Sequence, residues 1–279
     1  MCLLKNVLYF VNDGAIISIT KPFPGGDLMW EMLRRWLVGD LGNPGEFQYQ
    51  AIHIYSTLAV LAVCALVALL GTSRKLEDRK KRRLLVCISI FQLTFELAWR
   101  LIYVTVKGDN ILCWWPLYPC NLGGVLLPII ALCNWKAGKK MFYLFGFVGG
   151  VLTFALPEGI FSSDVMSFPI LKSVLQHTGI LMIPILEYAM GSYRPTLKHM
   201  GWIVAGTLVH LLNCEGITRL LGFTGDYMFF RSGMPFVIPG VPQPITLSVF
   251  ALFVLVALCF ASDPKGSWNT IKYKNKKRL

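Results

Sequence analysis

The chain has 279 residues, of which 55% are hydrophobic and only 15% are charged, and its mean hydropathy is +0.57. These values exclude an ordinary soluble globule and indicate an integral membrane protein with a single membrane domain. The net charge of +12 does not require a nucleic-acid partner, because the basic residues cluster beside apolar runs, where membrane topology and anionic lipid account for them. We therefore predict an all-α, polytopic membrane helical bundle.

Residues 1–50 are predicted to form an extracytoplasmic segment. Within it, residues 28–37 place apolar side chains on one helical face and Glu31, Arg34 and Arg35 on the other. This pattern is typical of an amphipathic helix that lies in the outer membrane interface. A helix packed on the protein outside the membrane gives the same pattern, and the sequence leaves both interpretations open.

Apolar runs follow that are suited to crossing a bilayer, which takes about 17 to 25 residues in a helix. They cover residues 51–71, 84–106, 118–133, 141–156, 173–190, 200–214 and 244–261, and the third, fourth and sixth are short. The short runs are expected to use flanking residues to reach the interface. We predict about seven transmembrane helices in a domain covering residues 51–261, followed by a basic tail at residues 262–279.

The connections between the runs alternate in charge. Most of the 27 Lys and Arg residues lie after the first, third, fifth and seventh runs, in segments 74–83, 136–140, 194–198 and 265–278. Because cytoplasmic loops carry the excess of basic residues, the N-terminus is expected outside and the basic tail in the cytoplasm.

Polar side chains within the runs gather in the half of the bilayer that faces outward. Such side chains are costly in lipid, so each marks a candidate site unless it has a structural partner. They are His53, Glu96, Arg100, Cys120, Asn121, His177, His210 and Asn213, whereas Glu187 and Tyr188 lie in the inner half. A site that opens to the outer leaflet is expected.

Cys120 and His177 suggest nucleophilic chemistry. A thiol becomes a nucleophile when an imidazole nearby takes its proton, and both residues lie close to the outer ends of their helices. Asn121, or backbone amides of residues 116–122, would stabilise an oxyanion. Two alternatives remain open: a disulfide between Cys113 and Cys120, and a Cys120 that only fills space.

The other ionisable side chains have plain structural explanations. Glu96 and Arg100 are spaced i, i+4 and can pair on one helical face, which we favour over a direct catalytic role. His53 and His210 can each hydrogen-bond a neighbouring helix. No Cys or His pair has metal-ligand spacing, so neither a metal nor a cofactor is expected.

The segment from Trp115 to Leu122 reads WPLYPCNL, and here the chain resembles the transmembrane protein 164 / YwaF family of integral membrane proteins. Further matches follow in order along the chain. They are His53, Gly149-Gly150 to Pro157, Gln176-His177, Tyr193-Arg194-Pro195, Asp226-Tyr227 and Pro235. The resemblance covers about residues 46 to 262.

The resemblance implies an acyltransferase that remodels glycerophospholipids, with an intramembrane Cys that carries the acyl group and a His that serves as base. Carried over, these residues are Cys120 and His177. Tyr118 stands where the family commonly has His, so any role of that His is lost or passes to a phenol. We therefore expect a lipid acyltransferase or acyl hydrolase in a bacterial cell membrane, with membrane lipids as substrates.

The remaining polar residues are assigned to substrate in this hypothesis. His53, Glu96, Arg100, His210, Tyr118 and Asn213 are the candidates for contacting a lipid head group or supporting the site. Two other interpretations stay open. One is a seven-helix transporter or sensor for a small solute or lipid, in which Pro128 and Pro184 would interrupt helices; the other is a scaffold without turnover.

Overall fold

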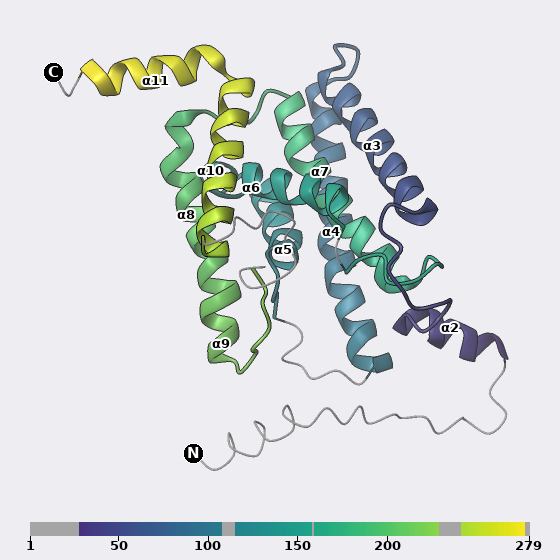
Figure 1. Ribbon diagram of the computed structural model, residues 1–279. Helices are drawn as coiled ribbons and strands as arrows, with labels where there is room; N and C mark the ends of the chain where they lie inside the picture. The colour runs from purple at the N-terminus through teal and green to yellow at the C-terminus, as the bar shows by residue number, and fades with distance from the viewer. Residues whose placement is uncertain (1–27, 108–114, 158, 229–240, 277–279) are drawn as a thin grey trace.

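The computed structural model describes residues 28–107, 115–157, 159–228 and 241–276, and within these residues it is helical with no strand. The order of elements is α2 (Leu28–Val38), α3 (Ala51–Thr72), α4 (Asp78–Lys107), α5 (Pro119–Leu132), α6 (Lys136–Ala155), α7 (Phe168–Ala189), the short η2 (Leu197–His199), α8 (Met200–Leu211), the π-helical turn η3 (Leu212–Ile217), α9 (Thr218–Leu220), α10 (Gln243–Ser262) and α11 (Pro264–Lys276) (Figure 1). Cys113, Arg231 and Pro235 lie outside the described residues.

Five helical segments are long and apolar enough to cross a membrane. They are Ala51–Thr72, Asp78–Thr105, Phe168–Ala189, Leu197–Leu220 and Gln243–Ser262, and Pro119–Leu132 is a shorter apolar helix. The expectation of a membrane-embedded helical protein is therefore confirmed. The count of seven spans and the orientation of the termini stay predictions.

α3, α5, α8 and α10 begin within one residue of the predicted runs, whereas α4, α6 and α7 begin five or six residues earlier. The added first turn of α6 carries Lys139, which forms a buried ion pair with Glu187. Pro128 and Pro184 lie inside α5 and α7, and both helices continue through them. The interruptions that the transporter interpretation expected at these prolines are absent from these two helices.

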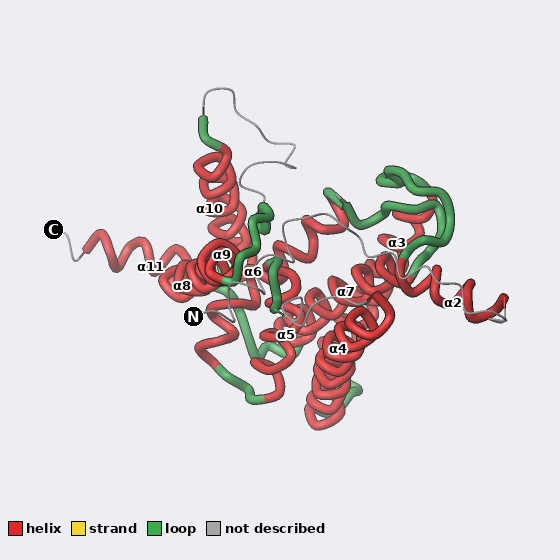
Figure 2. Tube along the Cα trace, turned by 90° about the horizontal axis from the view of Figure 1, so that it is seen from below, coloured by secondary structure: helices red, strands yellow, loops and turns green. Residues whose placement is uncertain are grey.

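α7 forms the centre of the bundle. In its spanning window 67% of the residues are buried inside the protein, compared with 28% in α3 and 18% in α10. It packs against α3, α4, α5 and α6, while α8 and α10 lie on the far side of α6 (Figures 1 and 2). α7 is therefore shielded on several sides and can hold polar side chains away from lipid.

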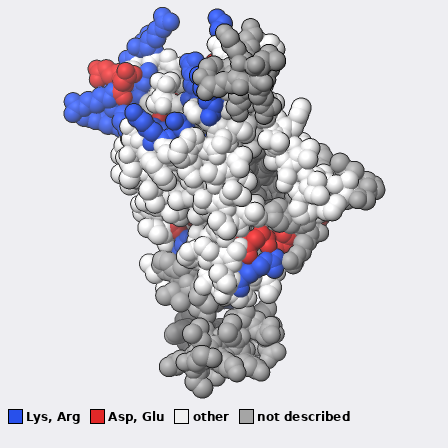
Figure 3. Space-filling model, turned by 90° about the vertical axis from the view of Figure 1, so that its left-hand side faces the viewer, with Lys and Arg blue, Asp and Glu red and all other residues white. Residues whose placement is uncertain are grey.

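The two ends of the bundle differ in charge. Figure 3 shows Lys and Arg gathered at the end where α11 and the α3–α4 connection lie, which we call the α11 end. At the opposite α2 end, α2 has no buried residue, and Leu28, Met29 and Trp30 are all more than half exposed. Trp36 ties it to the rest of the protein, since its indole N–H donates to the Met166 carbonyl at 2.8 Å and its ring packs against Phe168. That α2 lies in the membrane interface stays a prediction.

Candidate functional site

Cys120 lies in the first turn of α5, toward the α2 end. Pro119 occupies the first helical position, where its missing N–H removes no hydrogen bond, and so starts the helix at this point. The Cys120 side chain is a free thiol and is half-buried. Its Sγ lies 3.9 Å from Asn121 Oδ1, and the backbone amides of both residues approach the sulfur.

The chain leading into α5 is held by Asn213 of η3. Asn213 Nδ2 donates to the Pro116 carbonyl at 2.6 Å, and its Oδ1 accepts from the Trp115 indole N–H at 2.9 Å. The π-helical turn presents this amide to the segment before α5, a use of irregular helix that is common near functional sites. Asn213 thus contacts the protein itself, although the sequence assigned it to substrate.

Two side chains of α7, Lys172 and Gln176, form the wall beside Cys120. Gln176 Nε2 donates to the Cys120 carbonyl and to Asn121 Oδ1, both at 3.1 Å. Lys172 Nζ donates to Gln176 Oε1 at 2.6 Å and to Asn121 Oδ1 at 3.5 Å. Asn121 Oδ1 accepts these hydrogen bonds, so the Nδ2 group of the same amide remains available to donate hydrogen bonds to a ligand.

α4 contributes a buried carboxylate close to Gln176. Glu96 is fully buried, and its Oε2 accepts from the Trp99 indole at 3.1 Å and pairs with Arg100 Nη2 at 3.9 Å, as the i, i+4 spacing predicted. Its Oε1 is buried and has no hydrogen-bond partner among the described residues. Gly124 of α5 allows this approach, since a Cβ there would lie 2.9 Å from Glu96 Oε1 and 3.0 Å from Gln176 Nε2.

His177 follows Gln176 on α7 but points to another side of the helix. Its Nδ1 lies 2.8 Å from the Ser173 carbonyl oxygen, which can only accept, so Nδ1 carries the ring proton and Nε2 keeps its lone pair. The ring packs edge-on against Phe154 of α6. No hydrogen bond joins the Cys120 thiol to His177, both of which are described.

The other two histidines of the predicted polar layer are buried away from the thiol. His53 Nδ1 accepts from the Tyr49 amide at 3.0 Å, and the protonated Nε2 donates to the Phe154 carbonyl at 2.9 Å. This agrees with the expectation that a lone histidine bonds a neighbouring helix. His210 instead stacks on Phe145 at 4.4 Å between ring centroids, and its buried Nδ1 has no hydrogen-bond partner.

Tyr118 caps the start of α5 and is 38% exposed, with its ring edge-on to Tyr227 at 5.1 Å. Tyr118 is thus the more exposed of the polar side chains near the start of α5 and lies close enough to Cys120 to interact with it electrostatically. Within the described ranges, no group of three or more His, Cys, Asp and Glu side chains is arranged to hold a metal ion.

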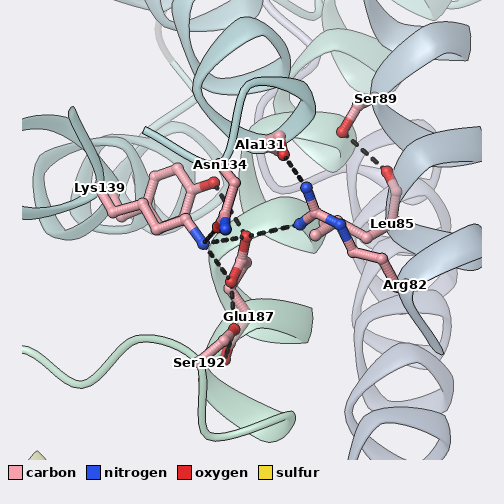
Figure 4. Close-up of polar contacts among 9 residues, drawn as sticks. Arg82, Leu85, Ser89, Ala131, Asn134, Lys139, Glu187 and Ser192 are labelled. Carbon is pink, nitrogen blue, oxygen red and sulfur yellow. Dashed lines mark hydrogen bonds and ion pairs between the residues drawn. The ribbon is translucent and has the colours of Figure 1, made fainter. Parts of the chain in front are cut away.

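A second polar cluster surrounds Glu187 at the α11 end (Figure 4). The Glu187 carboxylate is fully buried and pairs with Lys139 at 2.8 Å and with Arg82 at 3.6 Å. Tyr143 Oη donates to it at 3.5 Å, and the Ser192 hydroxyl makes a further short contact. The cluster joins α4, α6 and α7 and satisfies its own carboxylate.

Sequence reasoning missed Lys172 and the partners of Glu187. Lys172 is not among the candidates named from the sequence, but it is only 9% exposed and its Nζ donates to Asn121 Oδ1 at 3.5 Å. Its i, i+4 spacing from Gln176 in the first turns of an apolar helix was the available signal. Arg82 and Lys139 were counted as loop charges, and no local pattern ties them to Glu187.

The fold and these two clusters define a polytopic helical membrane protein with a polar, thiol-containing site between α4, α5 and α7. Residues 47–261 match the TMEM164 family, and the chain belongs to this family. Comparison with curated proteins gave no match, and neither did comparison with solved structures.

Proposed function

We propose that the protein is a membrane-embedded lipid acyltransferase or acyl hydrolase in which Cys120 carries the acyl group. The observation that carries the proposal is a free thiol in the first turn of a helix, inside a network of amide and charged side chains between membrane helices. A helix N-terminus and a nearby cation both favour a thiolate.

The chemistry divides into two half-reactions. His177 Nε2 takes the thiol proton, the thiolate attacks the acyl carbonyl of a lipid ester, and the ester C–O bond breaks as the departing alcohol receives that proton. The acyl group is then held as a thioester. In the second half-reaction the hydroxyl of another lipid, or water, gives its proton to His177 and attacks the thioester, which releases the thiolate.

The groups around the thiol support this assignment. The backbone amides of Cys120 and Asn121 approach the sulfur, and Asn121 Nδ2 is the free end of its amide, so donors are available for the oxyanion of the tetrahedral intermediate. The Nε2 lone pair of His177 is available to accept a proton. Because the thiol and the imidazole are not hydrogen-bonded, the proposal requires that lipid binding bring them together, directly or through water.

The substrate is proposed to come from the outer leaflet of a bacterial cell membrane. This follows from the predicted orientation, in which the start of α5, where Cys120 lies, faces the outer leaflet and the basic clusters face the cytoplasm. We assign the polar head group to Tyr118, which is partly exposed, and to Glu96 and Arg100 on α4, which are buried and would have to become accessible when lipid binds. His53 and Asn213 bond the protein itself: Asn213 holds the segment before α5 and so supports the site indirectly, whereas His53 joins α3 to α6.

The test is acyl capture in intact membranes. A lipid-like acyl electrophile, followed by mass spectrometry, is expected to acylate Cys120 in the natural protein and not in Cys120→Ser. The His177→Ala variant is expected to lose most of the adduct. Cys133→Ser is the matched control, since Cys133 is an exposed free thiol at the other end of α5.

An adduct that persists in His177→Ala at the natural rate would contradict the His177 base, and an adduct on Cys133 alone would contradict the nucleophile. The alternative, a transporter or sensor, loses the helix interruptions that it expected at Pro128 and Pro184. Solute uptake by proteoliposomes that continues after Cys120 is blocked would favour that alternative.

A further inference from the structure

Lys172 is a buried cation that the acyl-transfer steps above do not use. It lies in the first turns of α7, a spanning helix, and is 9% exposed. An ammonium is costly in such a place unless its surroundings stabilise the charge. The groups around Lys172 must therefore stabilise its charge.

The ammonium is held by neutral groups. Nζ donates to Gln176 Oε1 at 2.6 Å and to Asn121 Oδ1 at 3.5 Å, and it lies 4.1 Å from the centroid of the Trp99 ring. Amide oxygens and an aromatic face fix the position of a cation but do not cancel its charge. Lys172 forms no ion pair with a carboxylate of the described residues, whereas the buried Lys139 does.

The Cys120 thiol shares one of these partners. Asn121 Oδ1 lies 3.9 Å from Cys120 Sγ and 3.5 Å from Lys172 Nζ. The sulfur and the ammonium therefore contact the same oxygen atom. The charged and titratable groups that act on the thiol are Lys172 from α7, Glu96 and Arg100 from α4, Tyr118 before α5 and Cys214 from η3. Arg100 forms an ion pair with Glu96, and Glu96 also attracts Lys172 electrostatically. Within the described residues the direct contacts of the Lys172 ammonium are nevertheless with neutral groups.

We propose that Lys172 is a positioning residue for Cys120, whose ammonium stabilises the thiolate before attack and again when the thioester is resolved. The inference rests on the proposed function, because it assigns the partner of the same nucleophile. Lys172 keeps its proton throughout: the thiol proton goes to His177, and no bond to Lys172 forms or breaks. Gln176, Asn121 and Trp99 hold the ammonium in place for this purpose.

The test measures the thiolate directly in purified protein in nanodiscs. Two readouts are used: the rate of Cys120 alkylation by iodoacetamide at constant pH, and the ultraviolet absorbance of the thiolate relative to Cys120→Ser. Lys172→Met is expected to slow alkylation by roughly tenfold or more and to remove the thiolate absorbance. Lys172→Arg keeps the charge and is expected to retain most of both signals.

Lys81→Met is the matched control. Lys81 is also 9% exposed, but it pairs at 3.6 Å with the exposed Asp78 at the far end of α4, so both signals should stay at the natural level. If Lys172→Met does not fold, as judged by gel filtration, Lys172→Gln is compared with Lys172→Arg, and only the Gln variant should lose the signals.

The outcomes separate this inference from the proposed function. A natural protein whose Cys120 is unreactive would overturn both. A reactive Cys120 that reacts equally fast after Lys172→Met or Lys172→Gln would overturn the role of Lys172 and leave the nucleophile in place. Loss in Met or Gln together with retention in Arg supports the inference, because a role in packing alone does not depend on the charge.

Discussion

Lys139 and Lys172 are both buried lysines, but they have opposite surroundings. Lys139, 4% exposed, meets the Glu187 carboxylate at 2.8 Å, and the same carboxylate receives Arg82, Tyr143 and a serine hydroxyl. Lys172 meets two amide oxygens and an aromatic ring. Each lysine is enclosed, but only the first has its charge neutralised by direct contact.

The difference separates a structural cluster from a chemical one. Buried polar groups whose hydrogen bonds are all made within the protein stiffen its core. Buried charged or polar groups that lack such partners are instead candidates for contact with a ligand or a reactive group. Glu187 has several partners, whereas Glu96 Oε1 beside the thiol has none. The α11 end is thus expected to govern stability and the site near Cys120 to govern reactivity.

The largest effect is expected at the structural cluster. Glu187→Leu leaves Lys139 buried without its anion, which should destabilise the protein by about 3–5 kcal/mol. Unfolding in detergent, followed by circular dichroism, measures the loss. Cys120 alkylation in the folded fraction should stay unchanged, since no group of this cluster touches the thiol network.

The double variant with Lys139→Met is the control for this prediction. Removing both members also removes the unpaired ammonium, so the combined loss should be smaller than the sum of the single losses, with a coupling of about 0.5–3 kcal/mol. If the stability losses of the two single variants simply add in the double variant, the Lys139–Glu187 pair contributes little to stability. The contrast drawn between Lys139 and Lys172 would then have no support from stability measurements.

A smaller effect is expected from Gly124→Ala, which overpacks the site. The new Cβ would lie 2.9 Å from Glu96 Oε1 and 3.0 Å from Gln176 Nε2, so the network must shift, at about 1–3 kcal/mol of stability. Acylation of Cys120 should fall as well. Gly149→Ala on α6 is the control, because nothing lies within 4 Å of its Cβ and helix propensity should add up to about 1 kcal/mol.

Five of the seven predicted runs coincide with helices that are long and apolar enough to cross a membrane, because the length of an apolar run can be read locally from the sequence. The positions of Cys120 and Asn121 at the start of a helix followed in the same way from Pro119 and the apolar run behind it. The burial of Lys172 did not, because it depends on how α7 packs against Asn121 of α5 and Trp99 of α4.

The assignment of the remaining polar residues shows the same limit. His53 was expected to hydrogen-bond a neighbouring helix or contact substrate, and only the packing against α6 shows that both ring nitrogens bond backbone groups. The early start of α6 likewise reflects a partner, Glu187, that lies 48 residues along the chain from Lys139. The sequence identified polar residues within the apolar runs, but which of them contact one another depends on how the helices pack.

Asn213→Ala tests whether the segment before α5 must be held for the thiol to react. The change removes the contacts to Trp115 and Pro116, and we expect about 1–2 kcal/mol of destabilisation with a clear drop in Cys120 acylation. Melting and acyl capture measure the two effects. Thr207→Ala on α8 is the control, since its hydroxyl bonds only the Ile203 carbonyl of its own helix, and it should change neither by much.

The smallest effect is expected at an exposed contact near the α2 end, where Asp164 accepts from the amide and the side chain of Asn43, both at 2.7 Å. These donors hold the pKa of Asp164 below its ordinary value. A lowered folded pKa means that the carboxylate stabilises the fold above the unfolded value of about 3.9 and that this contribution is lost as pH falls through the folded pKa. Melting curves of natural protein and Asp164→Ala should therefore differ slightly at neutral pH and converge in acid.

The same measurement in an Asn43→Ala background sharpens this prediction. Without the side-chain donor the pKa of Asp164 should move back toward its ordinary value, so Asp164→Ala should then have less effect at neutral pH. A difference between natural protein and Asp164→Ala that grows as the pH falls would have the wrong sign and would contradict the contact. Because the contact is exposed and distant from the thiol, Cys120 alkylation should be the same in all these variants, unlike the variants at Lys172.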